Sequence, residues 1–340
     1  MKKTLLFFAM LCFTALAMAT IINVDQDPNR PSGYYENLQL ALNTAVAGDT
    51  IYLYPSNSSY GSIEVKKEIH IFGVGFDGTS GSVSRIGDIR LDSLSTQSGN
   101  PSASSFQGIK FSSLVCQKKN MSNIVIAGCE FSSVNLSYNC SSWLIVNNLI
   151  SGYISVSNNS LIIISNNIFM YSDYGIQSSN SPSVIVSHNL FFNWQDFNSV
   201  YNAIITDNIF MFNSYASSSS SMAHNIFNNN LGWRSALNPG LIPPESNTGS
   251  GNISNQDPEF ITASSTPNFD KTKDYHLSSS SAGKNAATDG TDIGVYGGST
   301  PFVWGGVFSI PKIILTNITN PVINQSTPIN VNIKANKAKL

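Results

Sequence analysis

Four short segments of the chain share one motif and decide its fold: LIVNNLI at residues 144–150, IISNNIF at 163–169, IVSHNLF at 185–191 and IITDNIF at 204–210. Each has an asparagine in its fifth place, and these asparagines are spaced 19, 22 and 19 residues apart. Cys129 occupies the same place 19 residues before the first, and Asn225 follows 17 residues after the last. Self-similarity at a nearly fixed period is the sequence signature of a repeat architecture. We therefore expect one structural unit per motif.

The period and the composition of the motif favour strands over helices. A repeat of about 19 residues is too short for the helix pairs of tetratricopeptide or ankyrin arrays, and β-branched residues dominate the run before each asparagine. Stacked parallel strands lie about 4.8 Å apart, so equivalent residues of successive repeats lie above one another. The sequence therefore predicts an all-β solenoid in which each repeat forms one coil.

Two columns of this solenoid follow from the spacing. The asparagines form a ladder of side-chain amides, in which each amide donates to the next coil and satisfies polar groups at a buried bend. Two residues further on, apolar side chains are expected to stack inside the coils. The members of this second column are Phe131, Ile150, Phe169, Phe191, Phe210 and Phe227.

The strand before each asparagine is apolar on both faces. Side chains three and five places before the asparagine share one face, because side chains alternate along a strand. The residues four places before it lie on the opposite face and are equally apolar, namely Val125, Leu144, Ile163, Ile185 and Ile204. A bare stripe of this kind favours aggregation or docking. We expect the tail from Phe308 to Leu340, or the segment before it, to cover the stripe.

The two ends of the chain carry different signals. Residues 1–19 combine two lysines, an apolar run and a small-residue cleavage site, which is the pattern of an export signal. Apolar residues at helical spacing from Tyr35 to Val46 predict a short capping helix. We predict five regions: a signal peptide at 1–19, an N-terminal cap with a short helix at 20–55, solenoid coils at 56–230, an irregular closing segment at 231–299 and a strand-like tail at 300–340. The expected location is secreted or at the cell surface.

Composition excludes several classes of partner. Of the 340 residues, 41% are hydrophobic but only 11% are charged, so asparagine and serine supply most of the polar surface. A formal net charge of −2 offers no basic field for nucleic acid. No apolar run is long enough for a transmembrane segment. Cys116, Cys129 and Cys140 follow the signal at spacings that fit neither a zinc site nor a disulfide framework, so we expect core or incidental thiols. We assign no cofactor and no metal.

Segments at both ends resemble a known superfamily. DTIYLYP at residues 49–55 and IHIFGVG at 69–75 are similar to the opening of secreted right-handed parallel β-helix proteins of the pectate-lyase-like superfamily. DPEF at 257–260 and DIGVYG at 292–297 resemble the closing segment of many bacterial members. The resemblance implies a right-handed, single-stranded parallel β-helix. The resemblance does not predict one activity, because the superfamily includes lyases, hydrolases, esterases, adhesins and proteins of unknown role.

The resemblance implies that an enzyme of this kind would act on polysaccharides with clustered carboxylates and a lysine or arginine. From Ser141 to Trp233 there is no lysine or arginine. The best remaining candidate catalytic residues come directly before the ladder asparagines, where His188, Asp207 and His224 are expected on three consecutive coils. Such a set could bind a metal or transfer protons. The alternative is that these are polar turn residues in a place that asparagine fills elsewhere.

Aromatic residues after the phenylalanine column offer a binding surface. If they point outward in a row, sugar rings can stack on them; if not, they pack in the core. The candidate ligand-binding residues are Tyr171, Tyr174, Trp194, Phe197 and Tyr201. The sequence thus favours an exported surface scaffold that binds an extracellular polysaccharide without catalysis, and the alternative is a polysaccharide lyase or glycoside hydrolase. The tail is a further candidate for docking to the cell envelope or to another subunit.

Overall fold

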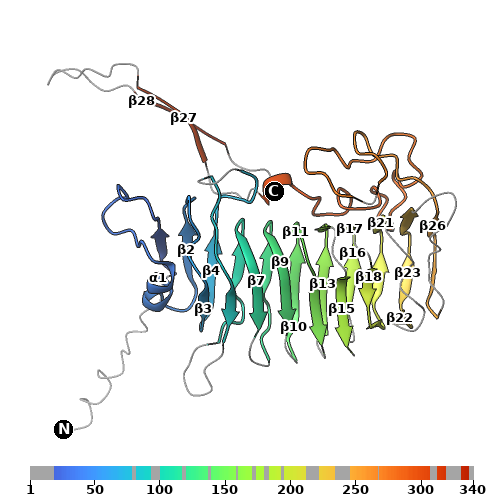
Figure 1. The fold of residues 1–340 in the computed structure, drawn as a ribbon, viewed down its shortest axis with the longest axis horizontal. Helices are drawn as coiled ribbons and strands as arrows, with labels where there is room; N and C mark the ends of the chain where they lie inside the picture. Colours follow the sequence, from blue (N-terminus) through green and yellow to red (C-terminus); the bar gives the residue numbers. More distant parts are fainter. Residues whose placement is uncertain are drawn as a thin grey trace, which may run out of the picture.

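The structure is a computed structural model of the 340-residue chain. It describes residues 19–78, 82–92, 100–116, 120–136, 139–157, 160–170, 174–179, 184–192, 195–211, 222–233, 246–266, 268–306, 312–318 and 331–336. These residues form an all-β solenoid whose parallel strands follow one another along its long axis (Figure 1). The predicted parallel β-helix is therefore confirmed.

Two long parallel sheets form the walls of the solenoid. The first has eleven strands, in the order β1 (Ile21–Val24), β2 (Asp49–Leu53), β4 (Ile69–Phe72), β6 (Ser105–Gln107), β8 (Val125–Ala127), β10 (Ser141–Val146), β13 (Ser160–Ser165), β16 (Val184–Ser187), β20 (Ile204–Thr206), β23 (Ile226–Asn228) and β25 (Thr248–Ser250). All its neighbouring strands pair in parallel, so each coil adds one strand to this wall.

The second sheet has thirteen strands and forks at β9 (Glu130–Leu136), which pairs with both β11 (Leu149–Ile150) and β12 (Ile154–Ser157). Its other strands are β3 (Ile63–Val65), β5 (Ile89–Leu91), β7 (Lys110–Cys116), β14 (Ile168–Phe169), β15 (Tyr174–Ser179), β17 (Leu190–Phe191), β18 (Gln195–Asn198), β21 (Ile209–Met211), β24 (Leu231–Trp233) and β26 (Ile253–Ser254). β19 (Val200–Tyr201) and β22 (Met222–Ala223) form a separate short ladder. After the fork, one coil therefore presents two outer surfaces, one on the β11 branch and one on the β12 branch.

The register confirms that residues of successive motifs lie above one another. Residues with the same place in the motif are consecutive partners in the first sheet, as are Leu144, Ile163, Ile185 and Ile204. At the corner between the sheets, the side chain of Asn148 donates to Oδ1 of Asn167 at 2.9 Å. The backbone amide of Cys129 donates to Oδ1 of Asn148, also at 2.9 Å, so Cys129 holds the ladder position before the first asparagine. These bonds form a buried asparagine ladder.

Beyond Asn208 the ladder departs from the prediction. Asn208 donates to Oδ1 of Asn230 at 2.9 Å. Asn225 belongs to a second ladder, in which it donates to Oδ1 of Asn247 at 2.8 Å. The predicted place of Asn225 was wrong because the stretch AHNIFNNN, residues 223–230, puts an asparagine at each of two corners of one coil.

Aromatic rings stack inside the coils, as the spacing predicts. The ring centroids of Phe169 and Phe191 are 4.5 Å apart, and those of Phe191 and Phe210 are 5.1 Å apart, with planes inclined by 11° and 23°. On the next coil the partner of Phe210 is Gly232. Phe227 lies in the first sheet instead. Its predicted place in the column was wrong because this coil is longer than the spacing of 17 residues implied.

The outer face of the first sheet remains partly exposed. Ile204 and its partner Ile226 are 43% and 44% exposed. The other members of the predicted apolar stripe are half-buried, namely Val125, Leu144, Ile163 and Ile185. The described residues of the segment before the tail do not share a core with this stripe. We call residues 257–266 and 268–306 the cover segment, and they lie over the second sheet instead (Figure 1).

The cover segment packs on the residue that directly follows each ladder asparagine. Leu149, Ile168, Leu190, Ile209 and Leu231 form this apolar column, and they share one core with Phe260, Tyr275, Leu277, Ile293, Val295 and Phe302 of the cover segment. For the segment before the tail, the expected cover was therefore placed on the wrong sheet. The side chains of residues 307–340 lie outside the described residues. On the second sheet this apolar column lies beside polar corner residues, among them Asn166 and Asn229, whose side chains donate to the backbone of the cover segment.

The ends of the solenoid follow the prediction in type and differ in extent. The helix α1 (Leu38–Thr44) buries Leu38, Ala41 and Leu42, and the side chain of Asn37 caps its N-terminus by accepting from the amide of Leu40. The strand ladders continue to Ser254, beyond the predicted end of the coils at residue 230. Within the described part of the chain, no helix has the length and apolarity needed to span a membrane.

Two predicted terminal regions are only partly covered by the structure. The tail strands β27 (Lys312–Ile318) and β28 (Val331–Asn336) pair with each other in antiparallel register, so the tail is strand-like as expected. Residues 307–311, 319–330 and 337–340 of the predicted tail lie outside the described residues. The predicted signal peptide also lies outside them, except for Ala19.

Candidate functional site

The residue before each ladder asparagine has a left-handed backbone. We call these residues the corner column: Asn147, Asn166, His188, Asp207 and Asn229, with φ values of 59°, 51°, 53°, 59° and 50°. Asparagine and aspartate adopt this conformation more readily than other residues with a side chain. The residue types at this position are therefore explained by the turn of the chain, which is the alternative that the sequence left open.

The corner column binds the cover segment. Nδ2 of Asn166 donates to the backbone carbonyls of Val295 and Gly297 at 3.0 and 2.8 Å. Nδ2 of Asn229 donates to the carbonyl of Ala286 at 2.8 Å. Since the cover segment has little regular secondary structure, these bonds satisfy backbone groups that no strand partner would satisfy.

The buried side chain of Asp207 also binds the cover segment. Its side chain is 1% exposed and accepts hydrogen bonds from the backbone amide and the hydroxyl of Thr288, at 2.7 and 2.6 Å. Nδ1 of His188 lies 3.9 Å from Oδ2 of Asp207, and its Nε2 lies 3.8 Å from Oδ1 of Asp289. His188 is also buried, and its Nε2 has no hydrogen-bond partner among the described residues. The cover segment thus separates His188 and Asp207 from any substrate in solution.

His224 does not join this pair. It comes before Asn225, which belongs to the second asparagine ladder, and its backbone amide donates to the carbonyl of Ser246 at 2.9 Å. His224 is exposed, whereas the coil that follows Asp207 contributes Asn229 to the corner column. The predicted alignment of three candidate catalytic residues was therefore wrong. No group of three or more His, Cys, Asp or Glu side chains in the described ranges is arranged to hold a metal ion.

Of the five predicted aromatic ligand-binding residues, the structure describes the side chains of Phe197 and Tyr201. Phe197 is 3% exposed and packs against Phe191 and Phe210 in the core, so it cannot contact a ligand from outside. Tyr201 is half-buried in β19. The backbone of Tyr174 begins β15, and Tyr171 and Trp194 lie outside the described residues.

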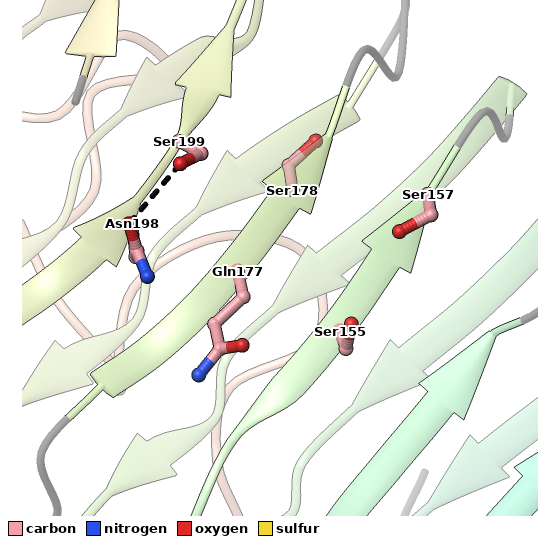
Figure 2. A pocket seen from close by; sticks show the side chains of 6 residues that line it. All are labelled: Ser155, Ser157, Gln177, Ser178, Asn198 and Ser199. Atoms are coloured by element: carbon pink, nitrogen blue, oxygen red, sulfur yellow. Dashed lines mark hydrogen bonds between the residues drawn. The ribbon is translucent and has the colours of Figure 1, made fainter.

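A small polar hollow lies instead on the β12 branch of the second sheet (Figure 2). Its volume is about 200 Å³, and its lining consists of Ser155, Ser157, Gln177, Ser178, Asn198 and Ser199. Ser155, Gln177 and Asn198 are register partners on β12, β15 and β18, so they form one row across three coils. Their neighbours in sequence, such as Ile154 and Ile176, are buried. The side chains of this row therefore point outward, and those that alternate with them point into the apolar core.

The chemistry of this hollow is that of uncharged donors and acceptors. Every lining residue carries a hydroxyl or an amide, which can both donate and accept hydrogen bonds. The hydroxyl of Ser199 donates to Oδ1 of Asn198 at 3.1 Å. Ser178 is the register partner of the buried Val156, so its Oγ lies on the inward face, where it has no hydrogen-bond partner among the described residues. The outward donors and acceptors of the hollow are therefore those of the row Ser155, Gln177 and Asn198.

A second, larger hollow lies at the N-terminal end. Its volume is about 560 Å³, and its lining is Gln26, Arg30, Tyr34, Tyr35, Glu36, Asn37, Leu40 and Tyr60. Arg30 forms an ion pair with Glu36 at 2.7 Å, so the one cation and the one carboxylate of the lining neutralise each other. Burial, together with the nearby charge of Asp25, raises the pKa of Tyr60 to about 12. Its phenol therefore remains protonated and donates to backbone carbonyls.

The corner column gives a testable account of Asp207. We expect Thr288→Val to weaken the docking of the cover segment by about 1–3 kcal/mol, because the carboxylate of Asp207 loses a donor in a buried place. Hydrogen exchange of the amides in residues 283–306, measured by mass spectrometry, should become faster while the amides of the central coils change little. The matched control is Thr272→Val, whose hydroxyl bonds an exposed carboxylate and which should change stability by less than about 0.5 kcal/mol. Equal exchange in both variants would contradict the anchoring role.

Comparisons with known proteins give no family for this chain. No family model matches the sequence, and no curated protein matches it. Among solved structures, the crystal structure of pectate lyase Pel9A is similar, with a TM-score of 0.42 and 13% sequence identity over 82% of this chain and 96% of that chain. Function must therefore be argued from the residues of this chain.

Proposed function

We propose that this chain is an exported protein that binds a neutral extracellular polysaccharide on the outer surface of β12, β15 and β18. The observation that carries the proposal is the uncharged hollow formed by Ser155, Gln177, Asn198 and their neighbours. Sugars present hydroxyls in several directions, and a surface of hydroxyls and amides can meet them as donor or as acceptor. No catalytic step is part of the proposal.

The charge distribution favours a neutral polymer over an acidic one. No lysine or arginine occurs from Ser141 to Trp233, which includes all three strands of the hollow. A polymer of acidic sugars would bring carboxylates to this surface, and binding them would leave the charges without a partner. Unpaired charges that lose water on binding are costly.

The repeat of the solenoid favours an extended ligand. Ser155, Gln177 and Asn198 are stacked at the spacing of parallel strands, about 4.8 Å. The same row begins one coil earlier at Asn135, which is the register partner of Ser155. A linear chain that lies along the solenoid axis can therefore meet one polar side chain on each coil.

A glycan array followed by calorimetric titration tests this proposal. We expect Gln177→Ala and Asn198→Ala each to weaken binding of a neutral oligosaccharide about 3–10-fold, which corresponds to one neutral hydrogen bond. The matched control is Gln107→Ala, because Gln107 is a half-buried amide on the first sheet. Unchanged affinity in both hollow variants, or preferential binding of acidic glycans, would contradict the proposal. New reducing ends or unsaturated products would favour a hydrolase or a lyase.

Export is the second part of the proposal, and Asp49 supports the cleavage position. Oδ1 of Asp49 accepts from the backbone nitrogen of Thr20 at 2.7 Å, and its Oδ2 accepts from the amide of Val46 at 2.8 Å. Cleavage after Ala19 would convert the nitrogen of Thr20 into a charged amino group. The buried carboxylate of Asp49 is placed to pair with that charge.

The pKa of Asp49 gives a pH-dependent test. Burial alone would raise this pKa, but hydrogen bonds from Thr20 and Val46 and the charge of Lys67 outweigh it, so the pKa lies below its usual value. A lowered pKa in the folded state contributes stability above the usual range of the carboxyl, and this contribution is lost as the pH falls below about 4. In urea unfolding of the exported chain, Asp49→Asn should remove part of this acid dependence, and more of it than the control Asp27→Asn, at an exposed position. N-terminal sequencing should find Thr20 first; a different first residue would contradict the cleavage position.

A further inference from the structure

Two of the three cysteines described by the structure lie in contact inside the coils. Cys116 ends β7 and Cys140 comes directly before β10, and their Sγ atoms are 3.3 Å apart. Cys116 is 2% exposed and Cys140 is fully buried. Sγ of Cys116 also lies 3.4 Å from Sδ of Met121. The structure holds both cysteines as thiols, so the contact is between two sulfur atoms that face each other in a closed core.

We propose that Cys116 and Cys140 form a disulfide bond when the chain folds in an oxidising compartment. The sulfur atoms need to approach by little more than about 1 Å to reach bonding distance. The bond would link the end of β7 to the start of β10. The coil formed by β8 and β9 lies between these two strands in the sequence. This inference goes beyond the proposed function and uses none of its observations about the hollow.

The oxidation proceeds by thiol–disulfide exchange with an external disulfide, such as that of an oxidoreductase or oxidised glutathione. The thiolate of one cysteine attacks the external disulfide, forms a mixed disulfide and releases one thiol of the donor. The thiolate of the other cysteine then attacks the mixed disulfide and releases the second thiol. Two cysteine thiols are oxidised, the donor disulfide is reduced to two thiols, and the two protons of Cys116 and Cys140 end on the donor.

Burial determines when this exchange can occur. Because both sulfur atoms are closed off from solvent in the finished coils, the reaction belongs to folding, before the coils of β7 and β10 have closed. Once formed, the bond is protected from reductants by the same burial. Cys129 provides the contrast, since its Sγ points to the carbonyls of Phe106 and Ala127 and not to another sulfur. Burial raises the pKa of the Cys129 thiol to about 12, which keeps it protonated and unreactive.

Refolding the full chain with a glutathione redox buffer tests the inference. The chain contains four cysteines, so a fully reduced chain has four thiols after denaturation. We expect two thiols after oxidative refolding, with Cys116 and Cys140 joined. Peptide mapping without reductant should find the tryptic peptide of residues 111–118 linked to the peptide of residues 120–234. Fragmentation of the linked pair should assign the bond to Cys140 and not to Cys129.

Variants make the result specific. Cys129→Ala should still lose two thiols on oxidation, whereas Cys140→Ala should retain the thiol of Cys116. The oxidised chain should melt about 3–8 °C above the reduced chain, and reductant should break the bond only after a denaturant is added. Four thiols after oxidative refolding of a chain with native circular dichroism, or a bond to Cys129, would overturn the inference. None of these outcomes depends on glycan binding, so the disulfide and the proposed function can fail separately.

Discussion

Asn189→Ala is expected to destabilise the protein by about 3–6 kcal/mol, because several buried groups lose their partners at once. Oδ1 of Asn189 accepts from both the backbone amide and the side chain of Asn167, at 2.9 and 3.0 Å. Its Nδ2 donates to the carbonyl of Ile164 at 2.9 Å and to Oδ1 of Asn208 at 3.0 Å. Each buried donor or acceptor left without a partner costs about 1–3 kcal/mol. Urea unfolding followed by circular dichroism measures the loss.

The matched control for this substitution is Asn135→Ala. Asn135 is half-buried on β9, points outward and forms no side-chain hydrogen bond with the described residues. Its removal should change stability by less than about 0.5 kcal/mol. Similar losses for Asn189→Ala and Asn135→Ala would show that the ladder bonds do not hold the coils together.

Phe191→Ala is expected to cost about 3–5 kcal/mol, the range for truncating a buried phenylalanine. Phe191 has no exposed surface, and its ring stacks on Phe169 and Phe210 and contacts Phe197 at a centroid distance of 5.5 Å. The substitution would leave a cavity between Phe169 and Phe210. The neighbouring coils could fill this cavity only by moving closer together. Thermal unfolding monitored by calorimetry should show a lower melting temperature and a single transition.

Phe191→Leu separates the volume of the ring from its stacking. Leucine keeps most of the apolar volume, so the expected cost is below about 1.5 kcal/mol. A loss as large as that of Phe191→Ala would mean that the stacking geometry, and not the filled volume, provides most of the stability. A loss near zero for Phe191→Ala would contradict the column as a source of stability.

The sequence predicts the coils well because the same order of residue types recurs in each coil. Asparagines at Asn148, Asn167 and Asn189 follow β-branched strands and precede large apolar residues, and this order fixes strand, corner and core together. The prediction fails where one coil carries two corner asparagines, at Asn225 and Asn230. Only the hydrogen-bond partners of each asparagine distinguish the two ladders.

The cover segment could not be placed from sequence. Its contacts join residues far apart in the chain, such as Asn166 with Gly297, and no periodic pattern reports them. For the same reason His188 and Asp207 invited a catalytic interpretation, although they stand in a left-handed corner and lie beneath the cover segment. Asparagine at the equivalent corner positions Asn147 and Asn166 was the sequence signal that His188 and Asp207 are turn residues.

The polar hollow was also missed, for a different physical reason. Serine, glutamine and asparagine occur throughout this chain as ordinary surface residues, so Ser155, Gln177 and Asn198 stand out only when their register is known. A sequence signal exists in the alternation with buried Ile154 and Ile176, which puts the polar residues on the outer face. That signal identifies the face but not the hollow, which depends on how the three strands stack.

A crystal structure of the exported chain with the tightest-binding neutral oligosaccharide tests the central claim most directly. The account predicts an intact sugar chain over β12, β15 and β18, parallel to the solenoid axis, with hydroxyls bonded to Gln177 and Asn198. A sugar chain bound only at the larger N-terminal hollow, or a cleaved product at any site, would contradict it.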